Sequence, residues 1–453
     1  PHLCTDAHAV LALRKLMFQS LLVHDGMEAS PLLSKSWEQT DNGRRWIFQL
    51  QQGITFPDGR EMTARDAVYS LKRAASAAIQ GQLYTVTYHE YFGGAEIRAT
   101  DAYTVELVNP EPLSCLEELL SDLVILPEGW TSPADGTGTG PYILDGHDSS
   151  GVHLSLRKDM NHPRPLPLKL IFQEEKDALR RVNRVRAGDA SLALDPPISE
   201  VSVYSASPNL RCIGWDTSLS VIFFIRCDLP PLDNPVVRQA LNLAVDTRSL
   251  IETIAHGQAK PLNGPFSDRH LARDPDLQPY PFNPEEARRL LKQEGLEDAM
   301  SLEVHAPTTI PAEGPALAES LAKYFRQIGI DARVYLHEDR KEYARAIAEK
   351  ELPGVCCFDS SPSSSYKVLR EKLDSSFAGT WWQGYHNGEV NNLIAKASNT
   401  VDPTLRREAL RQAYRILHHE APWVFLYQPK RFYLAGTGGD KVLSIDNLGY
   451  FVL

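Results

Sequence analysis

The sequence predicts an α/β fold, and three observations lead to this prediction. Residues 301–305 and 330–336 have the pattern of strands, and an amphipathic helix is expected between them at 316–328. This strand–helix–strand order is typical of two parallel strands joined by a crossover helix. The apolar run at 221–225 indicates a strand that is covered on both faces. At 453 residues the chain is long enough for about three domains or lobes.

Composition excludes some classes of function. The chain has 47 Lys and Arg against 58 Asp and Glu, a net charge of −11, and no basic stripe of the kind that binds nucleic acid. It contains no run of about 18 apolar residues that could span a membrane. The cysteines form no CxxC pair, so we expect small buried thiols, with one long-range disulfide left open, rather than a metal or redox site. They are Cys4, Cys115, Cys212, Cys227, Cys356 and Cys357.

The first 120 residues predict a β-rich unit with two helices. Residues 44–50 alternate as a half-buried strand, and 103–108 form another. Thr63 has the features of a helix N-cap, with Asp66 at the capping-box position, so a helix is expected at 64–78. A short helix is expected at 115–120.

The rest of the chain mixes strands and helices. Strands dominate the prediction for 143–230, including 152–157 and 168–172. Asn234-Pro235 and Asn283-Pro284 each supply an N-cap and a proline in the first turn of a helix, and the second helix should end at Gly295. Further elements are predicted as helices at 389–397 and 404–419 and a final strand at 445–452.

Signatures of catalysis are missing from the sequence. It has no GxxxxGK[ST] loop, no GxSxG elbow and no HExxH motif. The segment 138–142, Gly-Thr-Gly-Pro-Tyr, does not fit a phosphate loop because no helix is expected after it and Pro141 has no amide donor. Nothing in the sequence therefore demands an enzyme, although one with dispersed carboxylates stays open at this point, and no cofactor and no metal are expected.

Several segments resemble, in order, the bacterial extracytoplasmic solute-binding proteins of the oligopeptide, dipeptide and nickel type (family 5), which are receptors of ABC importers. The most specific stretch runs from Phe56-Pro57-Asp58-Gly59 to Thr63-Ala64-Arg65-Asp66-Ala67-Val68-Tyr69-Ser70. The other similar segments are Pro1-His2, 31–38, 46–50, 138–142, 231–241 and 384–394. Asp58, Gly59, Asp66 and Arg238 in these motifs are interpreted as turn, cap and packing positions.

The resemblance implies a two-lobed periplasmic-binding-protein fold (class II) with a small β-rich domain inserted in the first lobe. The implied division is 1–27, 146–228 and 431–453 for lobe I, 28–145 for the insert and 229–430 for lobe II. The implied function is capture of a small solute, a peptide or another amine- or carboxylate-bearing compound, by hinge closure and its delivery to an ABC permease. A monomer in the periplasm or tethered outside the membrane is expected, with a signal segment upstream of Pro1.

The resemblance also suggests candidate ligand-binding residues. Asp359 matches the family position that holds a ligand ammonium, with capping of the segment 360–365 as the alternative. The other candidates are Trp381, Trp382, Tyr385 and His386 near a family pocket wall, and His8 and Arg14 near the start of the chain. The tryptophans could instead be core and surface residues, His8 an exposed loop residue, and Arg14 part of a surface ion pair.

Two alternative functions stay open from sequence alone. A receptor for a metal chelate, an opine or a sugar would rely more on His8, His386 and the tryptophans than on Asp359. The ligand-sensing domain of a transcriptional regulator would carry a basic helix-turn-helix upstream of Pro1, where an importer would carry a signal peptide.

Overall fold

The computed structural model describes residues 8–24, 28–76, 88–131, 138–160, 165–297, 300–309, 311–436, 444–445 and 451–452; for 8–12 and the last two ranges it describes the backbone alone. The chain forms two compact units. Unit 1 contains the described residues up to Trp215 and from Arg431 onward, and unit 2 is Asp216–Lys430. Within the described residues, the chain passes between the units after Trp215 and after Lys430.

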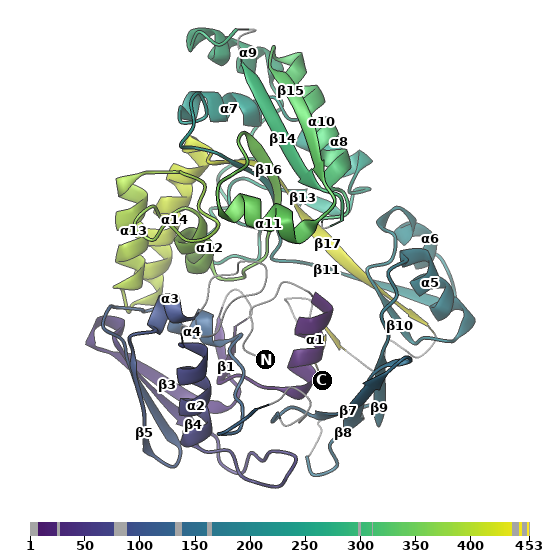
Figure 1. Cartoon of the computed structure of the whole chain (residues 1–453), viewed down its shortest axis with the longest axis vertical. Coiled ribbons are helices and arrows are strands. Elements are labelled where there is room, and N and C mark those ends of the chain that lie inside the picture. The colour runs from purple at the N-terminus through teal and green to yellow at the C-terminus, as the bar shows by residue number, and fades with distance from the viewer. Residues whose placement is uncertain are drawn as a thin grey trace. The chain divides into compact units, whose positions relative to one another are not determined.

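A four-stranded antiparallel sheet with one helix forms the first part of unit 1 (Figure 1). The strand order is β3 (Ser34–Thr40), β4 (Arg45–Leu50), β6 (Thr104–Val108) and β5 (Glu96–Asp101), and α2 (Ala64–Ala74) packs on β5 and β6. Alternate residues of β4 are buried, as the sequence pattern predicts for a half-covered strand. The helix predicted at 64–78 ends at Ala74, and residues 77 and 78 lie outside the described ranges.

The second part of unit 1 is a three-stranded meander, β7 (Tyr142–Asp148), β8 (Gly151–Leu156) and β9 (Lys169–Phe172). Leu16 of α1 (His8–Met17) packs with Tyr142 and Leu154 in its core. The other elements of unit 1 are β1 (Leu22–His24), β2 (Ala29–Pro31), η1 (Asp41–Gly43), α3 (His89–Phe92), α4 (Leu116–Leu120), α5 (Ala178–Ala187), β10 (Leu192–Leu194), η4 (Ile198–Glu200), α6 (Val201–Ser205) and most of β11 (Leu210–Asp216).

Helix α5 lies in the region where we predicted mainly strands. Asp177 caps it by accepting a hydrogen bond from the Arg180 amide, and Gly188 ends it in the left-handed conformation. Val182 and Val185 are its buried residues, packed with Ala193, Tyr204 and Leu434. With five charged or polar residues among ten, the apolar face is too narrow to stand out in the sequence.

Unit 2 is built on a mixed sheet in which β17 (Trp423–Gly436), β12 (Ser220–Ile225), β16 (Val355–Ser360), β14 (Ser301–Pro307) and β15 (Asp331–His337) are neighbours in that order. Strand β12 is antiparallel to both of its neighbours, and all six of its residues are buried. Strand β14 is parallel to β15 and β16, and α10 (Gly314–Gln327) packs on β14 and β15. The predicted strand–helix–strand unit is confirmed.

Helices of unit 2 begin where the sequence predicts caps. Asn234 and Asn283 accept amide hydrogen bonds at the start of α7 (Pro235–Leu243) and α9 (Pro284–Gln293). The predicted C-terminal helices are α13 (Gly388–Ser398) and α14 (Pro403–Glu420), which lie side by side in Figure 1. The remaining elements are α8 (Thr247–Thr253), β13 (Ala259–Pro261), α11 (Arg340–Ala348) and α12 (Ser365–Lys372).

The prediction of one final strand at 445–452 is wrong. Ser444–Ile445 (β18) pairs antiparallel with Phe451–Val452 (β19), with Ile445 opposite Phe451, so these residues belong to two strands. Alternating hydrophobicity does not distinguish one strand from two short arms. Asn447 and Gly449 between them are residue types that favour turns, and this signal should have divided the run.

Five cysteines of the described part are free and carry no disulfide: Cys115, Cys212, Cys227, Cys356 and Cys357. Cys4 lies outside the described residues. Burial raises the pKa of Cys227 and of Cys356 to about 12, so both thiols stay protonated at neutral pH. The expectation of small buried thiols is confirmed for Cys115, Cys227, Cys356 and Cys357.

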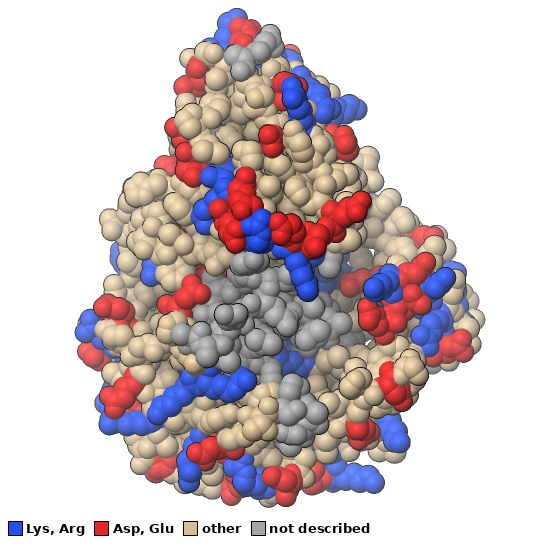
Figure 2. Space-filling model, in the orientation of Figure 1, with Lys and Arg blue, Asp and Glu red and all other residues tan. Residues whose placement is uncertain are grey.

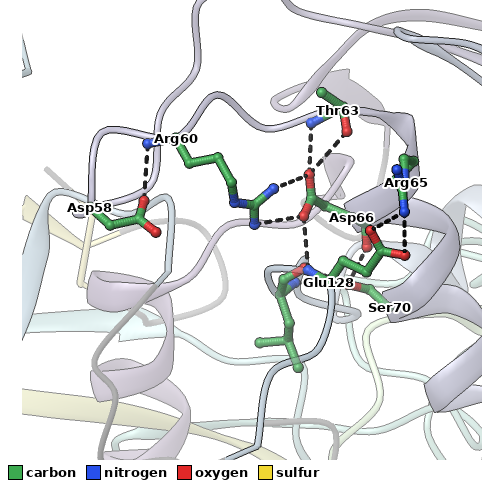
Figure 3. A network of polar contacts seen from close by, with 8 residues as sticks. Asp58, Arg60, Thr63, Arg65, Asp66, Ser70 and Glu128 are labelled. Carbon is green, nitrogen blue, oxygen red and sulfur yellow. Dashed lines mark hydrogen bonds and ion pairs between the residues drawn. The ribbon is translucent and has the colours of Figure 1, made fainter.

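Asp66 is the centre of a polar network in unit 1 (Figure 3). Its buried carboxylate accepts hydrogen bonds from the Arg60 guanidinium at 2.9 and 3.2 Å, the Thr63 amide at 2.8 Å and the Glu128 amide at 2.8 Å. Thr63 and Asp66 thus form the predicted capping box of α2. The Glu128 contact also ties this helix end to a segment 62 residues away.

Replacing Asp66 with Ala should lower the free energy of unfolding by about 2 to 3 kcal/mol, because the Thr63 and Glu128 amides and the Arg60 guanidinium lose a charged acceptor. The loss is limited because Arg60 is partly exposed and water can solvate it. Urea denaturation of the unliganded protein measures this loss. Asp58→Asn is the matched control, since the exposed Asp58 side chain accepts one hydrogen bond, from the Arg60 amide. Equal stability of the Asp66→Ala variant and the control would contradict a structural role for this carboxylate.

His270 is a buried neutral residue in unit 2. Its Nε2 lies 2.8 Å from the Pro362 carbonyl oxygen and its Nδ1 lies 2.9 Å from Ser267 Oγ. Since the carbonyl only accepts, Nε2 carries the proton and Nδ1 accepts from the serine hydroxyl. Burial lowers the pKa of His270 to about 4.

The pKa of His270 predicts a loss of stability in acid. Between pH 6.5 and 4 the unfolded state binds a proton at this residue and the folded state does not, so stability falls as pH is lowered, by up to about 3 kcal/mol. In His270→Gln the difference in unfolding free energy between pH 7 and 4.5 should shrink by most of this amount. The exposed His147→Gln is the control. An unchanged difference in His270→Gln would refute the assignment.

Candidate functional site

Asp359 lies at the carboxyl end of β16 in unit 2. It is half-buried and stands opposite Val221 of β12. Strands β14 and β16 are parallel, so their carboxyl ends lie at the same edge of the sheet. In α/β folds this edge is where ligands bind. The position of Asp359 therefore suits a ligand contact.

The serine-rich loop after Asp359 is held by hydrogen bonds. Ser364, not Asp359, caps α12, because its side chain accepts from the Lys367 amide at 3.0 Å. Ser218 Oγ donates to the Ser361 carbonyl oxygen, and Ser365 Oγ accepts from the Ala272 amide. The serines of this loop therefore have structural roles, and the N-cap of α12 is Ser364.

Trp381 and Trp382 have different surroundings. The buried Trp381 ring packs on Phe358 with 4.8 Å between centroids, and Phe358 in turn packs on Phe224. The partly buried Trp382 donates its indole N–H to the Tyr385 carbonyl oxygen at 2.6 Å, and the Lys350 ammonium lies 5.9 Å from its ring centroid. The two consecutive residues thus have different surroundings: Trp381 is a core residue, and Trp382 is partly exposed.

Tyr385 and His386 also differ. The buried Tyr385 hydroxyl donates to Glu420 at 2.7 Å, and Asn387 donates to the other oxygen of the same carboxylate at 2.8 Å. This network joins the start of α13 to the end of α14. His386 is exposed, with Nδ1 2.7 Å from Ser375 Oγ. Of the two, His386 has the more accessible side chain.

The two candidates near the start of the chain belong to unit 1. His8 is the first residue of α1, and its side chain lies outside what the structure describes. Arg14 is half-buried on the same helix. Asp359, Trp381, Trp382, Tyr385 and His386 all belong to unit 2, so the predicted site residues are divided between the two units.

Sequence reasoning missed one charged residue of this region, Lys372 at the end of α12. It is buried, and the charge of Asp359 acts on its ammonium. Its position at the end of an amphipathic helix gives no signal in the sequence, since basic residues are common in the last turn.

Charged side chains on the surface are mixed in sign. On the face that Figure 2 shows, Lys and Arg are interspersed with Asp and Glu. Around α11, for example, Arg345 pairs with Glu342, Glu349 and Glu351. Across the described ranges, no cluster of three or more His, Cys, Asp or Glu side chains is arranged to hold a metal ion. No helix of those ranges combines the length and the apolar character needed to cross a bilayer.

Comparison with solved structures shows the fold class. The structure is similar to that of HbpA2 from Haemophilus parasuis, with a TM-score of 0.83 at 20% identity, covering 100% of this chain and 95% of that one. It is also similar to the periplasmic binding protein DppA from Helicobacter pylori in complex with the peptide STSA, with a TM-score of 0.81 at 21% identity over 100% and 95% of the two chains. The chain thus has the predicted two-lobed periplasmic-binding-protein fold.

Comparison of sequences shows the family. The glutathione-binding protein GsiB of Salmonella paratyphi A is 25% identical over 94% of this chain and 86% of its own length. Heme-binding protein A of Haemophilus influenzae is 24% identical over 88% and 78%. These relatives are binding proteins and do not favour the regulator alternative. The family model of the bacterial extracellular solute-binding proteins, family 5 (middle), matches residues 28–386. The chain therefore belongs to family 5 of the bacterial extracellular solute-binding proteins.

Proposed function

We propose that this protein captures a peptide or a similar amine-bearing solute and delivers it to an ABC permease. Family membership supports solute binding, and the half-buried Asp359 carboxylate at the carboxyl end of β16 is the observation that supports the ligand class. A carboxylate that meets an ammonium forms a short charge-assisted contact and fixes the orientation of the ligand. His386 and Trp382, whose side chains are not fully buried, are the next candidates in unit 2.

The mode of capture that we propose is hinge closure of two lobes. The described part of the chain passes between the two units after Trp215 and after Lys430, and a small number of such connections allows a hinge. We propose that residues 1–27, 146–228 and 431–453 act as lobe I, that 28–145 form an inserted domain of that lobe, and that 229–430 act as lobe II. His8 and Arg14 would then contribute from lobe I.

The setting follows from the same proposal. Such a receptor works as a monomer in the periplasm or tethered outside the membrane, without a cofactor and without turnover of its ligand. The relatives named above bind different solutes, so the class of ligand needs a direct experiment.

A thermal-shift screen should identify the ligand class. A solute that binds only the folded protein stabilises it by about 2.7 kcal/mol at a concentration 100 times its Kd. The screen compares glutathione, dipeptides and tripeptides with heme, nickel–histidine, opines and sugars. We expect a peptide to raise the melting temperature. If only a chelate, an opine or a sugar does so, the proposed ligand class is wrong.

Replacing Asp359 with Ala should weaken binding of the peptide found in that screen by about 10- to 100-fold, because the buried part of the ammonium–carboxylate contact is lost. Isothermal titration calorimetry measures the change. The same peptide with an acetylated amine is the control ligand and should bind both proteins with similar, weak affinity. Asp331→Asn, on an exposed carboxylate of β15, is the control variant. Unchanged affinity for the free amine in Asp359→Ala would remove the proposed role.

A further inference from the structure

The two segments in which the described chain passes between the units belong to paired strands. Strand β11 ends at Asp216 and pairs with β17, which continues past Lys430 into unit 1. A hinge bends at a few residues that absorb the change in backbone angles. The contacts that hold these two segments, which we call the crossing segments, therefore determine where the chain can bend.

Lys260 bridges two carboxylates at the end of β11. Its ammonium donates to Asp216 Oδ2 at 2.6 Å and to Asp268 Oδ2 at 2.7 Å, and the three side chains are between 30% and 45% exposed. Burial lowers the pKa of Lys260, but the hydrogen bonds to both carboxylates raise it by more, so the ammonium keeps its charge. Two charge-assisted contacts hold a side chain more firmly than a single surface ion pair does.

The buried Gln428 of β17 connects the second crossing segment to the same cluster. Its Nε2 donates to the Thr217 carbonyl oxygen at 2.7 Å and to Asp268 Oδ1 at 2.6 Å, and its Oε1 accepts from the Asp268 amide at 2.9 Å. Thr217 Oγ1 donates in turn to the Pro429 carbonyl oxygen at 2.8 Å. One carboxylate, that of Asp268, therefore links the polar contacts of both crossing segments.

The loop that carries Asp268 is fixed in the core of unit 2. Two residues before it, the buried Phe266 ring stacks on Tyr414 of α14, with 5.0 Å between ring centroids. Two residues after it, the buried His270 is hydrogen-bonded to the Pro362 carbonyl oxygen at 2.8 Å. The cluster around Lys260 therefore belongs to the packed body of unit 2.

On the other side of each crossing, the chain is held by contacts within unit 1. Residues 433–435 of β17 pair with β10, and Trp215 packs on Tyr433 with 6.1 Å between ring centroids. The contacts of unit 1 thus reach Trp215, and those of unit 2 begin one residue later. Between the two sets of contacts lie the short links 215–216 and 430–431.

A simpler explanation is that the Lys260 bridge only adds stability, as many surface ion pairs do. Most such pairs join neighbours in the chain: Lys292, for example, pairs with Glu297 five residues later. The contacts of the Lys260 cluster span 44 residues to Asp216 and, through Asp268, 160 residues to Gln428. Because they meet at both crossing segments, they have a direct influence on the hinge.

We propose that Lys260 is a positioning residue for lobe closure: its bridge holds the ends of both crossing segments on unit 2 and confines bending to the links 215–216 and 430–431. A confined hinge has less conformational freedom to lose on closure, so it favours the closed form without a contact to the solute. The inference rests on the proposed hinge closure and deepens it, because the boundary of lobe I then lies at Trp215 and not at residue 228.

Distances between two spin labels test the inference without any solute. The labels are attached to Ser149→Cys in unit 1 and Ala316→Cys in unit 2, both at exposed positions, and Cys4 and Cys212 are replaced with Ser in every variant. In Lys260→Met the distribution of label distances, measured by double electron–electron resonance, should be wider than in the wild type. The reason is that more backbone bonds can bend once the crossing segments are released.

Two variants separate the hinge role from a loss of charge in general. Lys260→Arg keeps the charge and should retain the wild-type distribution, and so should Lys292→Met, which removes the exposed pair with Glu297. If Lys260→Met keeps the wild-type distribution, or if Lys292→Met widens it equally, the inference is overturned. Asp216→Ala, which removes the carboxylate of the first crossing segment, takes the place of Lys260→Met if that variant does not fold.

Hydrogen exchange locates the change in the chain. The amides of Leu219, Asp268 and Lys430 donate to Thr217 Oγ1, Gln428 Oε1 and the Gln258 carbonyl oxygen, respectively. In Lys260→Met these amides should exchange about 3- to 10-fold faster than in the wild type, whereas those of β14 should not change. Equal protection in both proteins would show that Lys260 does not hold the crossing segments.

Calorimetry with glutathione as the probe connects the hinge to binding. Lys260→Met should bind glutathione about 3- to 10-fold more weakly than the wild type, and Lys260→Arg should bind it equally well. Equal affinity for the wild type and Lys260→Met overturns the role of Lys260 and leaves the proposed function intact. If no peptide binds the wild type but Lys260→Met widens the label distribution, the proposed ligand class fails and the role of Lys260 stands.

Discussion

Strand β12 is buried along its whole length between β16 and β17, and this burial determines the register of the sheet in unit 2. Side chains alternate between the two faces of a strand. A shift of one residue in the pairing of β16 with β12 would therefore move every side chain of β16 to the opposite face of the sheet. Phe223 and Phe224 fill opposite faces of the sheet and make such a slip unfavourable. The position of Asp359 at the strand end, and of Tyr427 two strands away, depends on this packing.

Hydrogen bonds between polar groups that are close in sequence stabilise the starts of helices in both units. The caps Asn234, Asn283 and Ser364 each accept an amide hydrogen bond from the first turn of a helix. At the start of α2 the Asp66 carboxylate accepts from the amide of the N-cap residue Thr63 and also from a distant segment, at Glu128. Ser360 Oγ, by contrast, is buried and makes no hydrogen bond within the described part of the chain.

Local signals explain how much of the fold could be predicted. The caps, the crossover helix α10 and the buried run of β12 depend on residues within about one or two turns of each other, so the sequence alone reveals them. Helix α5 was missed because its buried face is only Val182 and Val185, and the hairpin at the chain end was read as one strand. Asp359 became a candidate only through the family resemblance, because no local pattern marks it. The burial of Lys372 could not be predicted, since it depends on how α12 packs in the folded chain.

The burial of the thiols has a consequence for the redox chemistry of the protein. Thiol–disulfide exchange requires a thiolate, and the raised pKa values of Cys227, Cys356 and Cys357 keep these sulfurs protonated and enclosed. In an oxidising compartment they neither form bridges with one another nor react with small disulfides. A single cysteine introduced at an exposed position of this protein would therefore react with a fluorescent maleimide faster than these three native thiols, which makes the chain a practical scaffold for an optical sensor of its solute.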